Sequence, residues 1–188
     1  MTQIPLFQPP SEWTPPEKIP DLSDAKEIAI DLETCDPSIK TKGPGWTRDE
    51  GFIAGVAIAV EGWKGYFPIR HEGGGNFDEK IIKRQVQRIM DLPCDKVFHN
   101  AAYDVGWLRW WGVEVKGKII DTLVAAPLID ENRFRYNLND LGRDYLKETK
   151  SEALLYEAAK EWGLDAKGEM YKLPPMYVGS YAEQDADL

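Results

Sequence analysis

The stretch IAIDLETCDP, residues 28–37, decides the fold prediction because it joins an apolar strand to a pair of acids. We place this strand over residues 26–34. Strand side chains alternate with a period of two, so Asp31 and Glu33 are expected to point to the same side. Parallel carboxylates repel each other unless a proton or a cation lies between them. The pair therefore predicts either a divalent-cation site or a solvent-facing acidic strand end.

The segments next to this strand predict further strands before any long helix. Residues 1–24 are rich in proline and polar residues, which indicates an extended arm. Residues 35–51 carry prolines and glycines and are expected to form a loop. Segments 52–62 and 64–75 read as two strands joined by a short glycine-containing turn, which is typical of a hairpin.

From residue 77 onward, segments whose apolar residues have helical spacing alternate with short segments typical of strands. Asp78 is expected to cap the first of these helices, Gly112 to end the second, and Asp121 or Thr122 to cap a helix after a strand. The order of elements predicts a mixed α/β domain, with an antiparallel part followed by crossover connections. The predicted helices cover residues 77–92, 101–112, 137–147, 151–163 and a segment that begins near 180, and the short strands cover 95–100 and 118–122.

Composition is that of an ordinary globular protein of 188 residues, with 43% hydrophobic and 29% charged residues. No apolar run approaches the roughly 20 residues needed to span a bilayer, and the N-terminus lacks the basic and apolar regions of a secretory signal. Cys35 and Cys94 are too few and too far apart to form a zinc site. We expect a cytoplasmic monomer with free thiols.

The net charge of −9 argues against a protein that holds nucleic acid non-specifically through basic residues. The basic clusters at 80–88 and 116–118, and the basic residues between 133 and 147, are interpreted as solvated helix faces. A site of carboxylates and divalent cations still accepts a polyanion, because bound metal ions invert the local charge.

Two later motifs also carry acids in unusual surroundings. FHNAAYDVGWL, residues 98–108, sets Asp104 among apolar residues, where a carboxylate is costly to bury unless it is paired or metal-bound. The alternative is a carboxylate favoured by the helix dipole. His99 in this motif is interpreted as a polar strand end. YAEQD, residues 181–185, places Tyr181 and Asp185 at i and i+4 on one helix face, which equally fits an ordinary exposed face.

The three motifs, in this order, resemble those of the DEDD superfamily of 3′–5′ exonucleases, in the subclass with a tyrosine-type third motif. The chain is most similar to the proofreading domain of family A, DNA polymerase I-like DNA polymerases. The resemblance covers residues 25–188 and includes IDTLVAAPLIDENRFRYNLNDLGRDYL, residues 120–146. It implies an RNase H-like fold, with a mixed five-stranded central sheet whose first three strands are antiparallel, flanked by helices. In that family the helix that carries Asp185 runs further, so it looks truncated at Leu188.

The resemblance also implies the site. The metal ligands would be four carboxylates that hold two divalent ions, Mg²⁺ or Mn²⁺, and a tyrosine would orient the attacking water. The product would be a nucleoside 5′-monophosphate. The implied catalytic residues are Asp31, Glu33, Asp104, Tyr181 and Asp185, and the implied substrate contacts are Thr34, Asn100 and Tyr103.

The expected substrate is a single-stranded or frayed 3′ end of DNA, with a DNA polymerase domain as partner in cis or in trans. One alternative is an RNase D-like 3′–5′ exoribonuclease, because such enzymes share the tyrosine-type motif. Another is a non-catalytic binding module that keeps the fold. The first three motif acids, Asp31, Glu33 and Asp104, are expected to converge with Asp185 in one pocket, across up to 154 positions of sequence.

Overall fold

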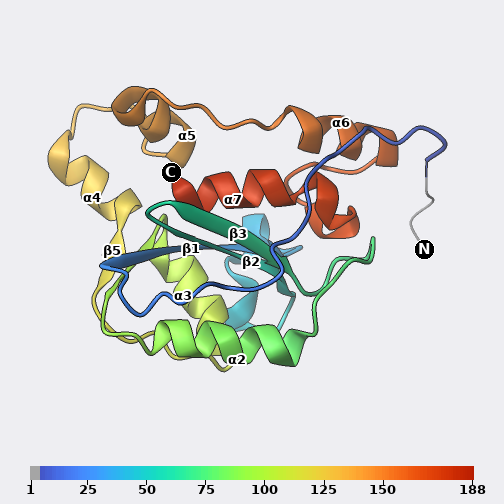
Figure 1. The fold of residues 1–188 in the computed structure, drawn as a ribbon. Coiled ribbons are helices and arrows are strands. Elements are labelled where there is room, and N and C mark those ends of the chain that lie inside the picture. Colours follow the sequence, from blue (N-terminus) through green and yellow to red (C-terminus); the bar gives the residue numbers. More distant parts are fainter. Residues whose placement is uncertain (1–4) are drawn as a thin grey trace.

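A five-stranded mixed sheet forms the centre of the molecule in the computed structural model, which describes residues 5–188 (Figure 1). The strand order is β3-β2-β1-β4-β5. The first three strands are antiparallel, and β4 and β5 run parallel to β1. This arrangement confirms the predicted sheet. The strands are β1 (Glu27–Cys35), β2 (Phe52–Val60), β3 (Trp63–Pro68), β4 (Asp95–Phe98) and β5 (Ile119–Asp121).

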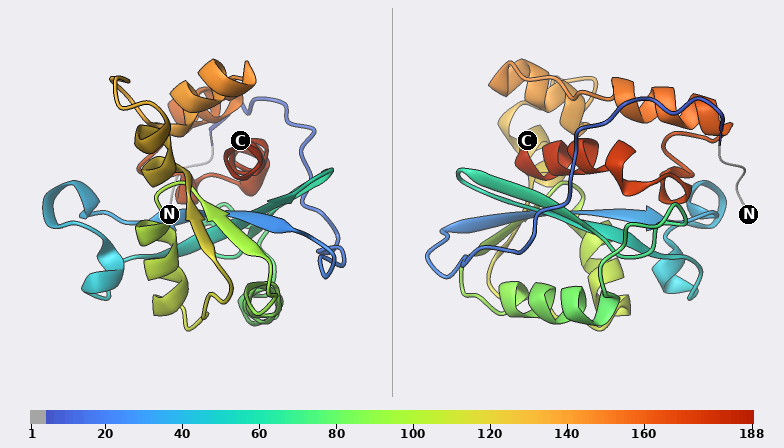
Figure 2. Two further views of the ribbon diagram at one scale, coloured as in Figure 1. Left: turned by 90° about the vertical axis from the view of Figure 1, so that its left-hand side faces the viewer. Right: turned by 45° about the vertical axis from the view of Figure 1, so that its right-hand side comes forward.

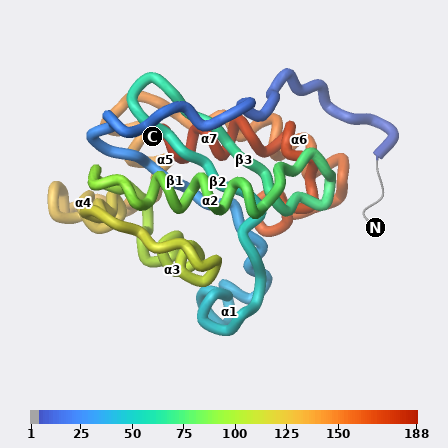
Figure 3. The backbone as a smooth tube through the Cα atoms, turned by 60° about the horizontal axis from the view of Figure 1, so that its bottom comes forward, coloured from blue at the N-terminus to red at the C-terminus, as the bar shows by residue number. Residues whose placement is uncertain are grey.

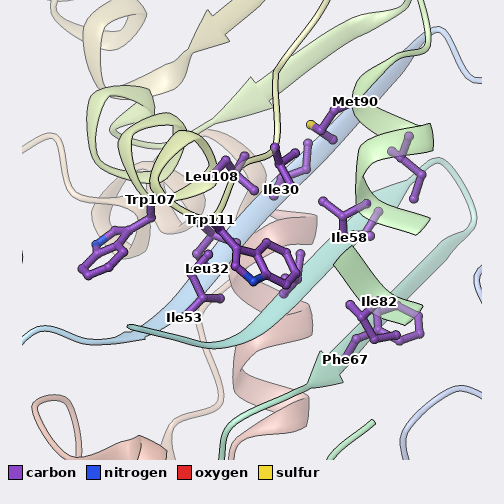
Figure 4. Close-up of a cluster of buried hydrophobic side chains, with 14 of the residues drawn as sticks. Ile30, Leu32, Ile53, Ile58, Phe67, Ile82, Met90, Trp107, Leu108 and Trp111 are labelled. Atoms are coloured by element: carbon purple, nitrogen blue, oxygen red, sulfur yellow. The ribbon is translucent and has the colours of Figure 1, made fainter. Parts of the chain in front are cut away.

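Helices α2 (Glu79–Met90) and α3 (Ala101–Trp110) cover one face of the sheet (Figure 2). The Asp78 side chain accepts a hydrogen bond from the amide of Ile81, which confirms the predicted cap of α2. Apolar residues at helical spacing on α2 and α3 meet the face of β1 that carries Ile30 and Leu32, together with the neighbouring strands, and Figure 4 shows this core. Its labelled members are Ile30, Leu32, Ile53, Ile58, Phe67, Ile82, Met90, Trp107, Leu108 and Trp111.

Helices α6 (Ala153–Trp162) and α7 (Gly179–Asp187) lie over the opposite face (Figures 1 and 2). The sheet residues beneath them are mostly small, with Ala57 and Ala59 of β2 fully or almost fully buried. Ala182 and Ala186 of α7 are also buried. Small side chains on both surfaces allow α7 to pack close to the sheet, and this brings its polar residues near β1.

The remaining helices include two short elements that the sequence pattern did not predict. The expected loop 35–51 contains α1 (Ile39–Lys42) and a 3₁₀ turn (Gly45–Thr47), and α1 projects from the body in Figure 3. Such short helices carry too few residues to show a period. Further elements are α4 (Thr122–Ile129), which Asp121 caps, and the 3₁₀ turns Met170–Lys172 and Pro175–Tyr177.

The predicted helix 137–147 is divided in two. It consists of α5 (Leu138–Leu141) followed by a π-helical segment, Gly142–Leu146. The change falls at Gly142, where a Cβ atom would lie 3.2 Å from a methyl group of Leu188. Glycine there leaves room for the end of the chain.

Residues 5–24 of the predicted arm carry no helix or strand, and residues 1–4 lie outside the described part of the chain. The arm packs on the layer that contains α7. Ser11 Oγ donates a hydrogen bond of 2.7 Å to the carbonyl of Met176. The ring of Trp13 lies where a Cβ on Gly179 would stand, 2.0 Å from that position. The arm therefore braces the start of α7. Within residues 5–188, no helix has the length and apolar character needed to cross a membrane.

Candidate active site

Asp31 and Glu33 lie on the face of β1 that α7 covers. Their partners across the antiparallel pair are Ala57 and Gly55, two small residues that leave room above the strand for other side chains. A Cβ atom on Gly55 would stand 2.1 Å from the hydroxyl oxygen of Tyr66, so glycine also lets that ring pack beside the acids. The register shifts between Glu33 and the next residue, which marks an irregularity at the acidic end of the strand.

Helix α7 brings the third acid to this pair. Tyr181 and Asp185 are separated by one helical turn, and Tyr181 is buried. Carboxylate oxygens of Asp31, Glu33 and Asp185 all lie within 4.8 Å of one another. The structure thus joins residues of the first and third motifs, which are 154 positions apart in sequence.

Asp104 approaches from α3, on the other side of β1. Its side chain is only 4% exposed. The pairing of β1 with β4 ends at Ala29, so the amide of Leu32 is free to donate to the Asp104 carboxylate. Asp104 interacts electrostatically with Asp31, but it is not one of the three residues whose oxygens lie within 4.8 Å of one another.

Asp31, Glu33 and Asp104 hold their protons more strongly than ordinary carboxyl groups do. Burial, and then the charge of Asp185, raise the pKa of Asp31 to about 7. Burial and the charges of Asp31 and Asp185 raise the pKa of Glu33 well above its ordinary value. Burial and the charge of Asp31 do the same to the pKa of Asp104. Each of these shifts shows that negative charge is costly here unless a cation is present.

Two lysines, which sequence reasoning missed, supply positive charge to the site. Lys150 Nζ lies 2.6 Å from Asp185 Oδ1, in an ion pair whose two side chains are each 9% exposed. Lys167 Nζ lies 3.8 Å from the centre of the Tyr181 ring. Both lysines lower the pKa of Asp31 and of Glu33, although burial outweighs them. No motif surrounds either lysine, because only the folded chain brings them to the acids.

Tyr181 keeps its hydroxyl proton. Burial raises its pKa, and the charges of Glu33 and Asp185 raise it further. Behind the site, the hydroxyl of Tyr66 lies 2.7 Å from His71 Nε2, and His71 Nδ1 lies 2.9 Å from the carbonyl of Leu173. Burial lowers the pKa of His71 to about 4, so this imidazole is neutral near pH 7.

The predicted substrate contacts fall in two places. The hydroxyls of Thr34 and Tyr103 lie 2.7 Å apart, and the Tyr103 hydroxyl also donates to Asp36. Asn100 is exposed at the start of α3 with a φ of 78°, and its amide donates to Asp121. Thr34 and Tyr103 therefore form one polar contact, whereas Asn100 lies at the junction with β5.

A cavity of about 360 Å³ reaches the site from the β4 side. Asp31 and Asp185 line it, together with His99, Thr122 and the C-terminal Leu188. Glu33, Asp104 and Tyr181 are not among its lining residues. The cavity therefore opens onto only one flank of the acidic cluster.

The donor set suits a hard divalent cation. All the groups that converge are carboxylates, the ligands that Mg²⁺ and Mn²⁺ prefer. The raised pKa values of Asp31 and Glu33 show that a cation would relieve repulsion that the two lysines do not remove. Within residues 5–188, the three-carboxylate group is the cluster with metal-ligand spacing.

Comparison with known proteins links this geometry to a family. A family model described as 3′–5′ exonuclease matches residues 14–188. A DNA-directed DNA polymerase of Pseudomonas phage M6 is 38% identical over 194 residues, which cover 99% of this chain and 29% of the polymerase. DNA polymerase I of Synechocystis sp. is 29% identical over 164 residues, 84% of this chain and 15% of that protein. The chain thus spans less than a third of the length of these relatives.

Solved structures share the fold at low sequence identity. RNase D of Trypanosoma brucei superposes with a TM-score of 0.60 at 19% identity, covering 88% of this chain and 55% of that one. NrnC of Brucella melitensis bound to pGG gives a TM-score of 0.58 at 18% identity, covering 89% and 71%. These likenesses confirm the expected RNase H-like arrangement of sheet and helices. By its family match and its polymerase relatives, the chain belongs to the 3′–5′ exonuclease family of DNA polymerase I-like enzymes.

Proposed function

We propose that this chain is a metal-dependent 3′–5′ exonuclease that hydrolyses the terminal phosphodiester of DNA and releases nucleoside 5′-monophosphates. The observation that carries the proposal is the convergence of Asp31, Glu33 and Asp185 within 4.8 Å, with Asp104 close enough to interact electrostatically with Asp31. Three carboxylates from β1 and α7 that converge, with a fourth from α3 that interacts with Asp31, have no evident structural use, since their charges oppose folding.

In the proposed reaction the four carboxylates hold two divalent ions. Bound Mg²⁺ or Mn²⁺ supplies Lewis acidity, which makes hydroxide available near neutral pH and offsets charge on the phosphate. Tyr181, whose hydroxyl stays protonated, orients the attacking water. Thr34 and Tyr103 are the proposed contacts for the terminal nucleotide, with Asn100 at the edge of the site.

DNA is the preferred substrate in this proposal because the relatives that match over most of this chain are DNA polymerases. The proposal also includes a proofreading role, with a polymerase domain as partner in cis or in trans, and the same relatives support it. The proposal includes a monomer that acts in the cytoplasm, in keeping with its two free cysteines.

The test is release of mononucleotides from a 3′-labelled single-stranded DNA in Mg²⁺ or Mn²⁺. We expect Asp31→Asn and Asp104→Asn each to lower the rate by about 100-fold or more, since each removes a ligand worth several kcal/mol in the transition state. Asp187→Asn is the matched control on α7, because Asp187 pairs with Lys64 at the surface. It should leave the rate within about two-fold of the parent protein.

The same assay separates the alternatives. A DNA and an RNA oligonucleotide of one sequence differ locally in the 2′-hydroxyl, so faster cleavage of RNA would favour an RNase D-like enzyme. Metal binding without any hydrolysis would favour a non-catalytic module. Equal rates for the parent and both aspartate variants would show that the residue assignment is wrong.

A further inference from the structure

Lys150 occupies a position where lysine is uncommon. Its side chain is 9% exposed, whereas lysine is rarely buried unless it is paired. Its ammonium group lies 2.6 Å from Asp185 Oδ1 and 5.4 Å from the centre of the Tyr181 ring. Lys150 belongs to no helix or strand, because the π-helical segment ends at Leu146 and α6 begins at Ala153.

The backbone on both sides of Lys150 is held by the residue next to Asp185. The amide of Ser151 donates to Gln184 Oε1 at 2.7 Å, and Gln184 Nε2 donates to the carbonyl of Thr149 at 3.0 Å. The amide of Lys150 donates to Asn139 Oδ1 at 3.3 Å. These bonds fix the backbone position of Lys150, so ordering its side chain toward Asp185 costs less conformational entropy than it would on a free loop.

Lys167 has a different environment. Its ammonium group pairs with Glu152 at 2.7 Å, and its side chain is 40% exposed. It contacts the ring of Tyr181 rather than a carboxylate of the cluster. Of the two lysines, Lys150 is therefore the one that forms an ion pair with a proposed metal ligand, Asp185.

We propose that Lys150 is the internal counter-ion of the carboxylate cluster, and that a divalent ion displaces its ammonium group from Asp185. This inference rests on the proposed function, since it takes Asp31, Glu33 and Asp185 as metal ligands. An ammonium group at 2.6 Å from Asp185 Oδ1 and a divalent ion at the same oxygen repel each other strongly. The four-carbon stem lets the ammonium group move while Gln184 keeps the backbone in place.

This exchange explains how the cluster persists without metal. Three carboxylates within 4.8 Å need a partner in the folded protein, and Lys150 provides it at Asp185. The consequence is weaker metal binding, because an incoming ion must first break the pair. Lys150 thus lowers the affinity for metal and raises the stability of the metal-free fold.

Calorimetric titration with Mn²⁺ tests the exchange. We expect Lys150→Met to bind Mn²⁺ about ten-fold more tightly than the parent protein, and to melt at a lower temperature in EDTA. Lys160→Met, at an exposed position of α6, removes the same charge and should change neither quantity. Unchanged or weaker Mn²⁺ binding by folded Lys150→Met would overturn the inference.

A second measurement uses the unaltered protein, in case Lys150→Met does not fold. Acetylation by an N-hydroxysuccinimide ester, read by mass spectrometry, should spare Lys150 in EDTA and modify it at saturating Mn²⁺. Lys160 should react equally in both conditions. Continued protection of Lys150 at saturating Mn²⁺ refutes displacement while leaving the metal site intact. If the parent protein binds no Mn²⁺ at all, both the exchange and the proposed function fail.

Discussion

At the scale of single residues, the main feature of the site is its concentration of negative charge. Burial raises the pKa of Asp31, Glu33 and Asp104, so each acid destabilises the folded, metal-free chain when it ionises. Lys150 and Lys167 offset part of this cost. Neutral residues at these positions would make the metal-free protein more stable. Acids that are kept in spite of this loss of stability are typical of a functional cluster.

Asp31 gives a pH prediction whose sign follows from linkage. Its folded pKa of about 7 lies above the ordinary value of 3.8, so the folded state binds the extra proton. Stability in EDTA should therefore fall as pH rises from 4 to 7, by about 2–4 kcal/mol from this residue. Asp31→Asn should flatten that part of the profile, as measured by chemical denaturation at each pH.

Excess Mn²⁺ should reverse the slope of this profile, because metal binding requires the ionised carboxylates. The control is Asp95→Asn, an aspartate of β4 that pairs with Lys118 away from the cluster. A profile for Asp31→Asn that matches the parent in EDTA would mean that another group sets the slope.

The sequence predicted the acids of the site much better than it predicted their partners. Strand alternation was enough to align Asp31 with Glu33, because a period of two is local. Joining them to Asp104 and Asp185 depended on the family resemblance. Lys150 was not predicted, because a buried acid cluster requires some cation but does not say which of 23 lysines and arginines supplies it.

At the scale of elements, the position of α7 determines whether the third motif reaches β1. The helix rests on small residues, Ala57 and Ala59, and it starts at Gly179, where the ring of Trp13 leaves no room for a side chain. The N-terminal arm thus contributes to the site from more than 160 positions away in sequence. Composition predicted an extended arm. However, a single tryptophan outside helices and strands does not indicate which part of the fold its ring contacts.

Gly179→Ala tests this bracing. The added Cβ would stand 2.0 Å from the Trp13 ring, so the ring or α7 must move. We expect a loss of about 1–3 kcal/mol in stability and a lower nuclease rate, since overpacked sites relax by shifting the backbone. Thermal unfolding and the mononucleotide assay measure the two effects.

Ser180→Ala, at the exposed neighbouring position, is the control and should alter neither measurement. The double variant Trp13→Ala, Gly179→Ala gives a sharper check, because removing the ring leaves the new methyl group without a clash. Its loss should be smaller than the sum of the two single losses. Strict additivity would show that Trp13 and Gly179 do not act on each other.

At the scale of the whole molecule, the net charge of −9 is the feature that an exonuclease must overcome. The chain has 32 acidic residues against 23 basic ones, and several of the basic ones pair with acids: Arg133 and Arg143 pair with Asp144, and Lys116 pairs with Asp91. The surface therefore offers little attraction for a phosphate backbone, which usually supplies most of the affinity for nucleic acid. We propose that divalent ions at the carboxylate cluster supply the attraction for phosphate that the surface lacks.

Binding of single-stranded DNA should therefore depend on metal more strongly than it does in a basic nuclease. Fluorescence anisotropy, with a labelled oligonucleotide whose 3′-terminal linkages are phosphorothioates that slow hydrolysis, should give at least about ten-fold weaker binding in EDTA than in Mn²⁺. Asp31→Asn should bind weakly in both conditions, whereas Asp187→Asn should respond to Mn²⁺ as the parent does. Equal affinity of the parent protein with and without Mn²⁺ would mean that side chains alone hold the strand, despite the acidic surface.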